Sequence, residues 1–479
     1  MSSTQVKRKK VRGVHEVSPI DVYRLLPGTN CGECGEANCM AYAARLVNGE
    51  YTLENCPPLN EENNKKLRIS LGELTAPPVR EISFGDARSS IKIGGKHVLF
   101  RHEFTYHNPV PIAIDVEDSL SGEEIVKRVN SIENFLYNYI GREMRLDAIA
   151  IRDTTGEPER FANAVRIARE HSDKPLILCT YNPKVMEKAI SLIPDSRPLL
   201  YAATTENWKE MAEIALNFSS PLVVSSPGDM GKLLSLATTL EASGVPDLVL
   251  DPGTFLEEDI AITISNFTAL RTSVFRDGSQ NIGYPLLGTP ITAWAGEDLS
   301  PEVSAWREAW AAPVLMSRYT DLLIMHSLEG WALLPALLWR FNLYTDPRKP
   351  VAVDAGIRPV GSPGKGSPVF ITTNYALTFF TVESDVKSAE IDCYLLVVDT
   401  GGLSVESAVA GRYLNPSSIA EAINGFCLSD LVDHRKIIIP GLAARISGDT
   451  EEVTGWEVLV GPKDSSGIPL FLRNRWNNS

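Results

Sequence analysis

LDAIAIRDTTGEPERFANAVRIAREHSDKPLILCTYNPKVMEKAISLI, residues 146–193, contains the same pattern twice in succession. Each copy begins with a nearly continuous apolar run, at 146–153 and at 176–182, and continues through a polar loop into a stretch of helical periodicity. Unbroken apolar runs of this length are typical of strands that are buried on both faces of a parallel sheet. The stretch therefore predicts two successive strand–helix units.

The pattern extends in both directions from this stretch. We expect strands at 111–116, 146–153, 176–182, 198–204, 221–226, 247–252, 284–289 and 321–327. Amphipathic stretches such as 122–140 and 159–171 separate them and predict helices. Strand–helix alternation of this number and length is typical of a (β/α)8 TIM barrel, which we place at residues 96–345.

A shorter alternation follows the barrel. Residues 346–479 contain strand candidates at 367–373, 393–400, 436–441 and 456–462, with helical stretches between them. This pattern predicts a small, doubly wound α/β domain, in which a ligand would bind at the carboxyl ends of the strands. The chain is thus predicted to be of the α/β class.

Polar residues follow several of the barrel strands: Asp115, Asp118, Arg152, Asp153, Asn182, Asp251 and His326. Two interpretations are open. Carboxylates and amides at barrel strand ends are suited to binding the edge of a pterin. Asp and Asn before a helix are also frequent N-caps, and this second role would explain most of them.

Four of the seven cysteines form a cluster near the start of the chain, with the spacing Cys31-x2-Cys34-x4-Cys39-x16-Cys56. Four thiolates can bind zinc or an iron–sulfur cluster. A zinc ribbon usually has two C-x2-C pairs, whereas three ligands in one loop plus a distant fourth favour [4Fe–4S]. We expect a helix to begin at Cys39. The acidic neighbours Glu33 and Glu36 are expected to lower the reduction potential.

We assign residues 1–60 to a tail and this cluster domain, and 61–95 to a linker. Lys7–Lys10 are expected to be a solvated tail, or a contact for an acidic partner. Cys179, Cys393 and Cys427 are expected to be buried apolar residues without a chemical role.

The composition excludes some classes of function. Among 479 residues there are 46 Lys and Arg against 60 Asp and Glu, a net charge of −14, which argues against nucleic acid as a partner. No apolar run approaches the roughly 20 residues of a membrane span. The N-terminus lacks the apolar core of a signal peptide, so we expect a cytoplasmic protein.

Beyond the cysteine spacing, three stretches carry a family resemblance: residues 18–46, 325–351 (MHSLEGWALLPALLWRFNLYTDPRKPV) and 372–385 (TTNYALTFFTVESD). Together with the domain order they resemble the large subunit of the corrinoid iron–sulfur protein. In methanogenic archaea the counterpart is the gamma subunit of the acetyl-CoA decarbonylase/synthase complex. The resemblance covers essentially the whole chain after the basic tail.

The resemblance implies a methyl carrier with two cofactors, a corrinoid (cobamide) and a [4Fe–4S] cluster. Cobalt(I) would accept a methyl group from a methyl-tetrahydropterin, methyl-tetrahydrosarcinapterin in archaea, and exchange it with the nickel centre of acetyl-CoA synthase. The cluster would reduce cobalt(II) that forms by accidental oxidation. The implied partners are the smaller delta subunit, as a heterodimer, and the acetyl-CoA synthase/CO dehydrogenase components.

For the corrinoid, sheet geometry and family likeness together favour the strand ends of the C-terminal domain: Thr372, Thr373, Asn374, Thr400, Gly401, Gly402, Pro440, Gly441 and Leu442. None of the seven histidines lies in an Asp-x-His-x-x-Gly motif, so we expect no histidine from this chain on cobalt. We assign no catalytic side chain.

Two other classes of function remain open at this stage. One is an iron–sulfur electron-transfer module on a scaffold barrel, without its own corrinoid. The other is a stand-alone pterin-dependent methyltransferase in which Asp153, Asn182 and Asp251 bind the pterin.

Overall fold

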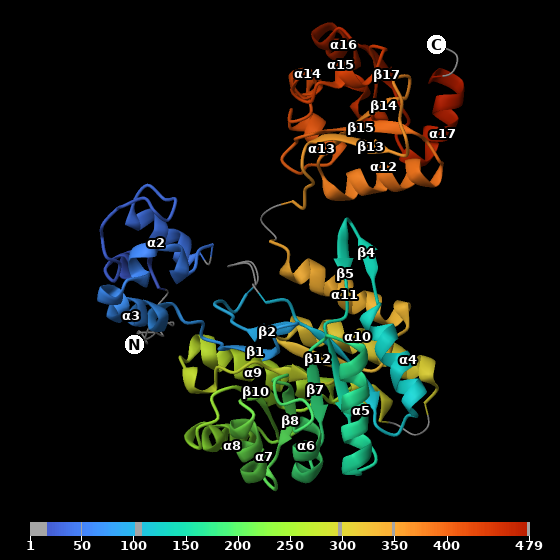
Figure 1. Cartoon of the computed structure of the whole chain (residues 1–479). Helices are drawn as coiled ribbons and strands as arrows, with labels where there is room; N and C mark the ends of the chain where they lie inside the picture. Colours follow the sequence, from blue (N-terminus) through green and yellow to red (C-terminus); the bar gives the residue numbers. More distant parts are fainter. Residues whose placement is uncertain (1–16, 49, 101–107, 296–298, 347–349, 477–479) are drawn as a thin grey trace, which may run out of the picture. The chain divides into compact units, whose positions relative to one another are not determined.

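The computed structural model describes residues 17–48, 50–100, 108–295, 299–346 and 350–476 (Figure 1). The basic residues Lys7–Lys10 lie outside these ranges. The chain divides into two compact units, residues 1–136 with 145–345 and residues 137–144 with 346–479.

The cysteine region is built from three helices: α1 (Pro19–Tyr23), α2 (Cys39–Val47) and α3 (Lys65–Thr75). They share an apolar core in which Val22, Leu59 and Leu71 are fully buried. Residues 61–95, for which we expected a linker, are therefore folded in this structure. Their amphipathic first half forms α3, and the second half forms a β-hairpin.

Eight parallel strands form the central sheet: β3 (Ile112–Glu117), β6 (Ala148–Arg152), β7 (Leu176–Cys179), β8 (Leu199–Ala203), β9 (Leu222–Ser225), β10 (Leu248–Asp251), β11 (Leu287–Gly288) and β12 (Leu322–Met325). Their order is β10-β9-β8-β7-β6-β3-β12-β11. A parallel bridge between Leu250 and Leu286 joins the two edges, so the sheet is nearly closed. The predicted eight-stranded barrel is confirmed.

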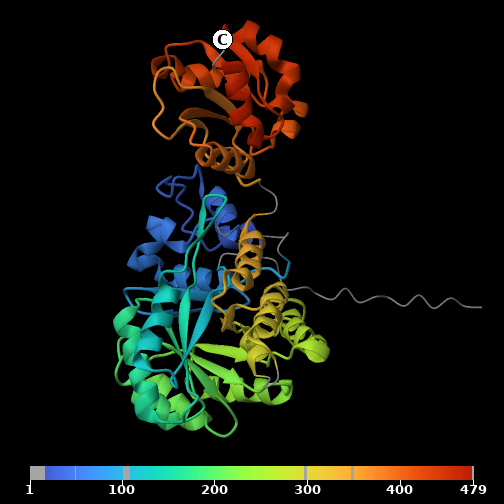
Figure 2. The same ribbon diagram turned by 90° about the vertical axis from the view of Figure 1, so that its right-hand side faces the viewer.

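The helices that follow the strands are α4 (Gly122–Glu133), α5 (Pro158–His171), α6 (Pro183–Ile190), α7 (Trp208–Asn217), α8 (Met230–Ala242), α9 (Ile260–Arg276), α10 (Pro301–Ser317) and α11 (Gly330–Tyr344). Figure 2 shows the strands enclosed by these helices. Among the described residues, no helix is long and apolar enough to cross a membrane.

A hairpin of β1 (Glu81–Gly85) and β2 (Ser90–Gly94) covers the amino ends of the barrel strands. Ile82, Phe84 and Ile93 pack into the same core as the inward-facing barrel residues. These side chains close the amino end of the barrel, where Asp321 also forms buried ion pairs with Lys96 and Arg271.

Residues 122–140 were predicted to form one helix, but only the first part of this stretch is helical in the structure. The helix α4 ends at Glu133, and β4 (Tyr137–Tyr139) pairs with β5 (Arg142–Met144) in a second hairpin. Ile140 and Gly141 form its turn, and both have positive φ, +49° and +68°. Two such residues match the twist of a hairpin, and the flanking tyrosines favour strands.

The C-terminal domain contains one five-stranded sheet in the order β13-β15-β14-β16-β17. Its strands are β13 (Gly356–Val360), β14 (Val369–Thr373), β15 (Cys393–Val398), β16 (Lys436–Ile439) and β17 (Glu457–Val460). Its helices are α12 (Ala376–Ser388), α13 (Val405–Ala410), α14 (Pro416–Gly425), α15 (Leu428–Leu431), α16 (Ser447–Thr454) and α17 (Ile468–Phe471). The four predicted strands are parallel neighbours, and the unpredicted β13 adds an antiparallel edge.

Candidate functional site

The four clustered cysteines differ in exposure. Cys31 is exposed and Cys34 is half-buried, whereas Cys39 and Cys56 are buried in the core of the cysteine region. Burial raises the pKa of Cys56, and the nearby sulfurs of Cys34, Cys39 and Cys31 raise it further. The fold thus brings these four sulfurs close enough to interact electrostatically.

Local hydrogen bonds fix the position of Cys39. The Asn30 backbone N–H donates to Cys39 Sγ at 3.3 Å, and the Cys39 N–H donates to Asn30 Oδ1 at 2.8 Å. Cys39 is the first residue of α2, and the Asn38 side chain caps that helix by accepting from the Ala41 N–H at 2.9 Å. A helix start at Cys39 was predicted and is confirmed; its N–H groups favour an anionic sulfur.

The sulfurs are spaced too widely for one small ion. Among the described residues, no three of them lie within 4.8 Å of one another. The four sulfurs around a single zinc ion would lie about 3.8 Å apart, given a Zn–S bond of about 2.3 Å. Four thiolates are also the donor set of a [4Fe–4S] cluster, whose irons span a larger site than one zinc ion.

The two glutamates beside the cysteines have different surroundings. Glu36 forms an ion pair with Arg45 at 3.0 Å and accepts a hydrogen bond from Tyr51 Oη at 3.1 Å. Glu33 is exposed and has no charged partner among the described residues. We expected both to add negative charge beside the site; Arg45 offsets that of Glu36.

The other three cysteines are not all buried as expected. Cys393 is buried and Cys179 is half-buried, but Cys427 is exposed. Cys427 has φ +51° at the junction of α14 and α15, so this reversal of the chain turns it outward.

The second candidate site is a cavity of about 370 Å³ at the carboxyl ends of β14, β16 and β17. Three of the nine residues predicted to contact a corrinoid line it, Thr372, Pro440 and Leu442. Thr378 and Thr381 of α12 and Lys463 after β17 also line it, although we had not predicted them. The two threonines lie three residues apart, a spacing that places both on one face of a helix.

The predicted residues Asn374, Thr400, Gly401 and Gly402 build the neighbouring loop. Asn374 Oδ1 accepts from the Thr400 N–H at 3.0 Å, Thr400 Oγ1 at 2.9 Å and the Gly402 N–H at 2.9 Å. Its Nδ2 donates to Asp399 Oδ1 at 2.9 Å. These bonds show that Asn374 positions the loop after β15.

Two buried hydroxyls at this sheet edge lack partners. Thr372 and Thr373 are 1% and 0% exposed, and neither Oγ1 has a hydrogen-bond partner among the described residues. A buried hydroxyl without a partner is costly, which points to a ligand that supplies one. Gly441 allows the adjacent loops to approach closely, because a Cβ there would lie 2.7 Å from the Lys463 nitrogen.

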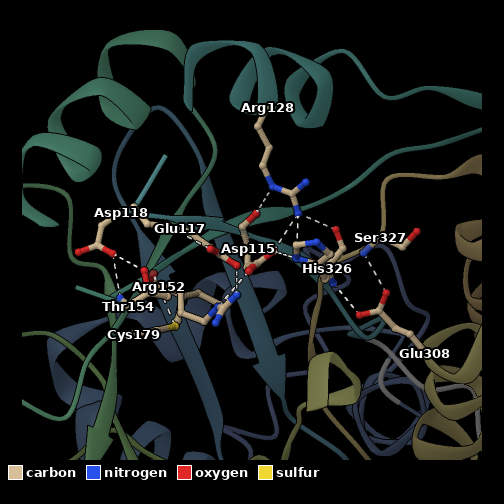
Figure 3. A network of polar contacts seen from close by, with 12 residues as sticks. Asp115, Glu117, Asp118, Arg128, Arg152, Thr154, Cys179, Glu308, His326 and Ser327 are labelled. Carbon is tan, nitrogen blue, oxygen red and sulfur yellow. Dashed lines mark hydrogen bonds and ion pairs between the residues drawn. The ribbon is translucent and has the colours of Figure 1, made fainter. Parts of the chain in front are cut away.

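The carboxyl end of the barrel has a network centred on Asp115, which is fully buried on β3 (Figure 3). Its carboxylate accepts from Arg128 Nη2 at 2.8 Å, Arg152 Nε at 3.0 Å and His326 Nδ1 at 2.7 Å. Burial opposes ionisation, but the His326 hydrogen bond and the two arginines hold the pKa of Asp115 below its ordinary value.

His326 is fixed from several sides. Its ring lies 4.3 Å from that of Trp294, and its carbonyl accepts from Arg128 Nη2 at 2.6 Å. The backbone N–H groups of His326 and Ser327 donate to the Glu308 carboxylate at 2.6 and 2.9 Å, and burial raises the pKa of Glu308. Asp115 and Glu117, the two carboxylates grouped closely with His326, are both paired with arginines, so we assign no metal there.

The other polar barrel residues have mainly structural contacts. Asn182 caps α6, and Asp118 accepts from the N–H and hydroxyl groups of Thr154 and Thr155. Asp153 accepts from Gly156 and Thr180. Buried Asp251 accepts from Tyr201, Ser225 and Gly253. The interpretation as caps and loop braces is supported for these residues.

Comparisons with known proteins identify the family. Residues 26–58 match the family model described as "Putative Fe-S cluster". Residues 81–472 match the model described as "CO dehydrogenase/acetyl-CoA synthase delta subunit". Among solved structures, dihydropteroate synthase from Xanthomonas albilineans is similar at a TM-score of 0.37 and 16% identity, covering 50% of this chain and 95% of that one.

Two proteins that align with nearly the whole chain are more similar to it in sequence than this solved structure is. The acetyl-CoA decarbonylase/synthase complex subunit gamma of Methanothermobacter thermautotrophicus is 44% identical, over 95% of this chain and 98% of the relative. The gamma subunit of Methanosarcina acetivorans is 43% identical, over 96% of this chain and 98% of the relative. One family model carries the name of the delta subunit, but the near-complete coverage by gamma subunits decides the assignment. The chain belongs to the family of acetyl-CoA decarbonylase/synthase complex gamma subunits.

Proposed function

We propose that this chain is a methyl-carrying corrinoid iron–sulfur subunit. It accepts a methyl group from a methyl-tetrahydropterin and exchanges it with the nickel centre of acetyl-CoA synthase. It works as a heterodimer with the smaller delta subunit, next to the synthase and CO dehydrogenase components. The observation that carries the proposal is the four-cysteine loop, whose donor set and spacing fit a [4Fe–4S] cluster, in a chain of this family.

Cys31, Cys34, Cys39 and Cys56 hold the cluster in this proposal. The hydrogen bond from Asn30 N–H to Cys39 Sγ stabilises charge on that sulfur. The exposed Cys31 is the edge at which electrons enter or leave, since the other ligands are covered to a greater extent. A purely electron-transferring role shares this region and differs only in lacking cobalt.

The corrinoid binds at the carboxyl edge of the C-terminal sheet and supplies the cobalt that carries the methyl group. Thr372 Oγ1 gives it a buried hydrogen bond, and Leu377 and Leu442 cover it from water. The cavity of about 370 Å³ is at the small end of the range for drug-sized ligands, so it holds one arm of so large a cofactor. Thr373, Gly401 and Gly402 support this edge.

No histidine of this domain reaches that edge. His434 Nε2 bonds the Ser367 carbonyl at 3.0 Å, and its Nδ1 accepts from the Lys436 N–H at 3.2 Å, both at the amino ends of strands. This position supports the expectation that the chain supplies no histidine to cobalt.

A stand-alone pterin methyltransferase has less support. It would need Asp153, Asn182 and Asp251 to face a ligand, and the structure engages all three in contacts of their own.

Metal analysis of protein purified without oxygen tests the proposal. We expect about four iron atoms and one cobalt per chain, the contents of one cubane and one corrinoid. Iron without cobalt would contradict the methyl-carrier role and support a purely electron-transferring module. Zinc in place of iron would overturn the cluster assignment.

Replacing one ligand separates the roles of the two cofactors. Cys39→Ala should remove the cluster absorbance and the reductive recovery of oxidised protein, while protein reduced beforehand still transfers methyl groups. Cys427→Ala, which changes an exposed cysteine elsewhere, is the matched control and should behave as the natural protein. Equal loss of recovery and transfer in Cys39→Ala would mean that the cluster is mainly structural.

A further inference from the structure

A second cavity lies at the rim of the barrel, between α4 and the segment that follows β12. Its volume is about 400 Å³, and it is lined by Glu117, Leu120, Glu124, Lys127, Arg128, Ser131, His326 and Leu328. The residues that it takes from α4 recur at intervals of three or four, so they form one face of that helix. None of the roles proposed above uses this cavity.

The two carboxylates of the cavity both accept hydrogen bonds within the protein. Glu117 accepts from Arg152 Nη2 and from Ser119 Oγ. Glu124 Oε2 accepts from the Ser121 N–H at 2.9 Å and from its hydroxyl at 2.7 Å, as the capping box of α4. The charge of Glu117 is therefore balanced by Arg152, whereas Glu124 is engaged through Oε2 in the capping box of α4.

The donor groups of the cavity remain available. Arg128 uses Nε and Nη2 for Asp115 and His326, whereas Nη1 has no partner among the described residues. Lys127 is exposed, and no ion pair or hydrogen bond of its ammonium group occurs within the described ranges. The cavity thus combines two cationic donors that have bonding capacity left.

His326 adds a third group of fixed orientation. Asp115 is ionised, so His326 Nδ1 at 2.7 Å carries the hydrogen and donates it. This leaves Nε2, for which the described part of the chain offers no partner, as the ring nitrogen available to a ligand. A neutral ring accepts a hydrogen there, and a protonated ring donates one. The side chain is 25% exposed, so a ligand can reach it.

We propose that this cavity binds an anionic oxygen group, a phosphate or a carboxylate. Lys127 and Arg128 supply charge-assisted hydrogen bonds to its oxygens, and His326 Nε2 bonds a further oxygen or a P–OH group. Leu120 and Leu328 contact the apolar part of the molecule that carries the anion. The site does not depend on the proposed methyl transfer, because it consists of donors around a cavity that have no partner within the described ranges.

Calorimetric titration of the complete, cofactor-loaded protein with inorganic phosphate tests this site. We expect saturable binding that Lys127→Gln weakens about tenfold, the effect of losing one strong charge-assisted hydrogen bond. His326→Gln should also weaken it, with its folding verified by thermal denaturation. Lys184→Gln, at an exposed lysine at the start of α6, is the matched control and should bind as the natural protein does.

Competition then identifies the source of the anion. A reduced pterin with a glutamate tail should displace phosphate if the site receives a substrate's acidic tail, whereas tetrahydrobiopterin, which has no acidic tail, should not. Failure of both to compete assigns the site to free phosphate. Absence of saturable phosphate binding, or equal affinities of Lys127→Gln and Lys184→Gln, would overturn the proposal.

Discussion

The barrel and the C-terminal domain both present polar residues at the carboxyl ends of parallel strands, but these residues are satisfied to different degrees. In the barrel, Asp115 accepts from two arginines and a histidine, and Asp251 accepts from three neighbours. In the C-terminal domain, Thr372 and Thr373 are buried without a partner. The barrel groups brace the fold, whereas the unsatisfied threonines mark the place where a ligand completes the structure.

The largest effect that this comparison predicts is at Asp115. Asp115→Asn removes the charge shared by Arg128, Arg152 and His326, so it should lower the free energy of unfolding of the barrel by about 3 kcal/mol. Asp195→Asn, at an exposed aspartate, is the control. Urea denaturation measures the difference. A change of less than about 0.5 kcal/mol, as at an ordinary surface position, would show that the network is not a brace.

The same carboxylate predicts a dependence on pH. Its folded-state pKa is lowered, so its contribution to stability is present above the unfolded value of about 3.9 and is lost as pH falls through the folded value. The difference between natural protein and Asp115→Asn should therefore shrink below about pH 4. A difference that persists unchanged at lower pH would contradict the assignment of an ionised Asp115.

A smaller effect is expected at Asn374. Asn374→Ala removes three hydrogen bonds accepted by Oδ1 and one donated by Nδ2, all to the loop after β15. It should destabilise the C-terminal domain by about 2–3 kcal/mol. Asn182→Ala, which removes only a helix cap in the barrel, should cost about 1 kcal/mol. Equal costs would show that the loop does not depend on the Asn374 amide.

The regions that the sequence predicts correctly are those whose residue pattern is complete within a short stretch of chain. The barrel strands are apolar on both faces, so a short window suffices to find them. The hairpin at residues 137–144 was missed, because its residues continue the apolar spacing of α4 and only the Ile140–Gly141 turn interrupts it. The strand β13 was missed because Pro359 and Arg358 resemble a loop, and an edge position tolerates both.

The candidate sites show the same limit. The cysteine ligands were predictable because their spacing is local in sequence. Asn374 and Thr372 were both predicted as corrinoid contacts, but the sequence does not reveal that the Asn374 amide is engaged by residues 26 and 28 positions away. Nor does it reveal the Arg45–Glu36 pair, which depends on how α2 packs against the cysteine loop.

Two threonines of one domain give the most direct test of the comparison. Thr372→Val removes a hydroxyl without a partner, so ligand-free protein should be unchanged or up to about 1 kcal/mol more stable. Thr400→Val removes a hydroxyl that bonds Asn374 and the Leu403 carbonyl, and should cost about 1–2 kcal/mol.

Of these two variants, only Thr372→Val should bind the corrinoid more weakly, with a dissociation constant about tenfold higher. Absorbance of cobamide retained after dialysis measures this. Equal retention by the two variants would mean that the Thr372 hydroxyl does not face the ligand.

The smallest effect is at the cysteine loop, where Glu36 is paired and Glu33 is not. Arg45→Gln exposes the charge of Glu36, so the cluster should become harder to reduce by about 20–40 mV, the modest effect of a surface charge. Glu33→Gln removes an unpaired charge and should shift the potential by a similar amount in the opposite direction. Redox titration followed by electron paramagnetic resonance measures both. Both shifts should shrink as salt rises, because the charges are near the surface. Shifts of the same sign would mean that the variants act by deforming the loop rather than through their charge.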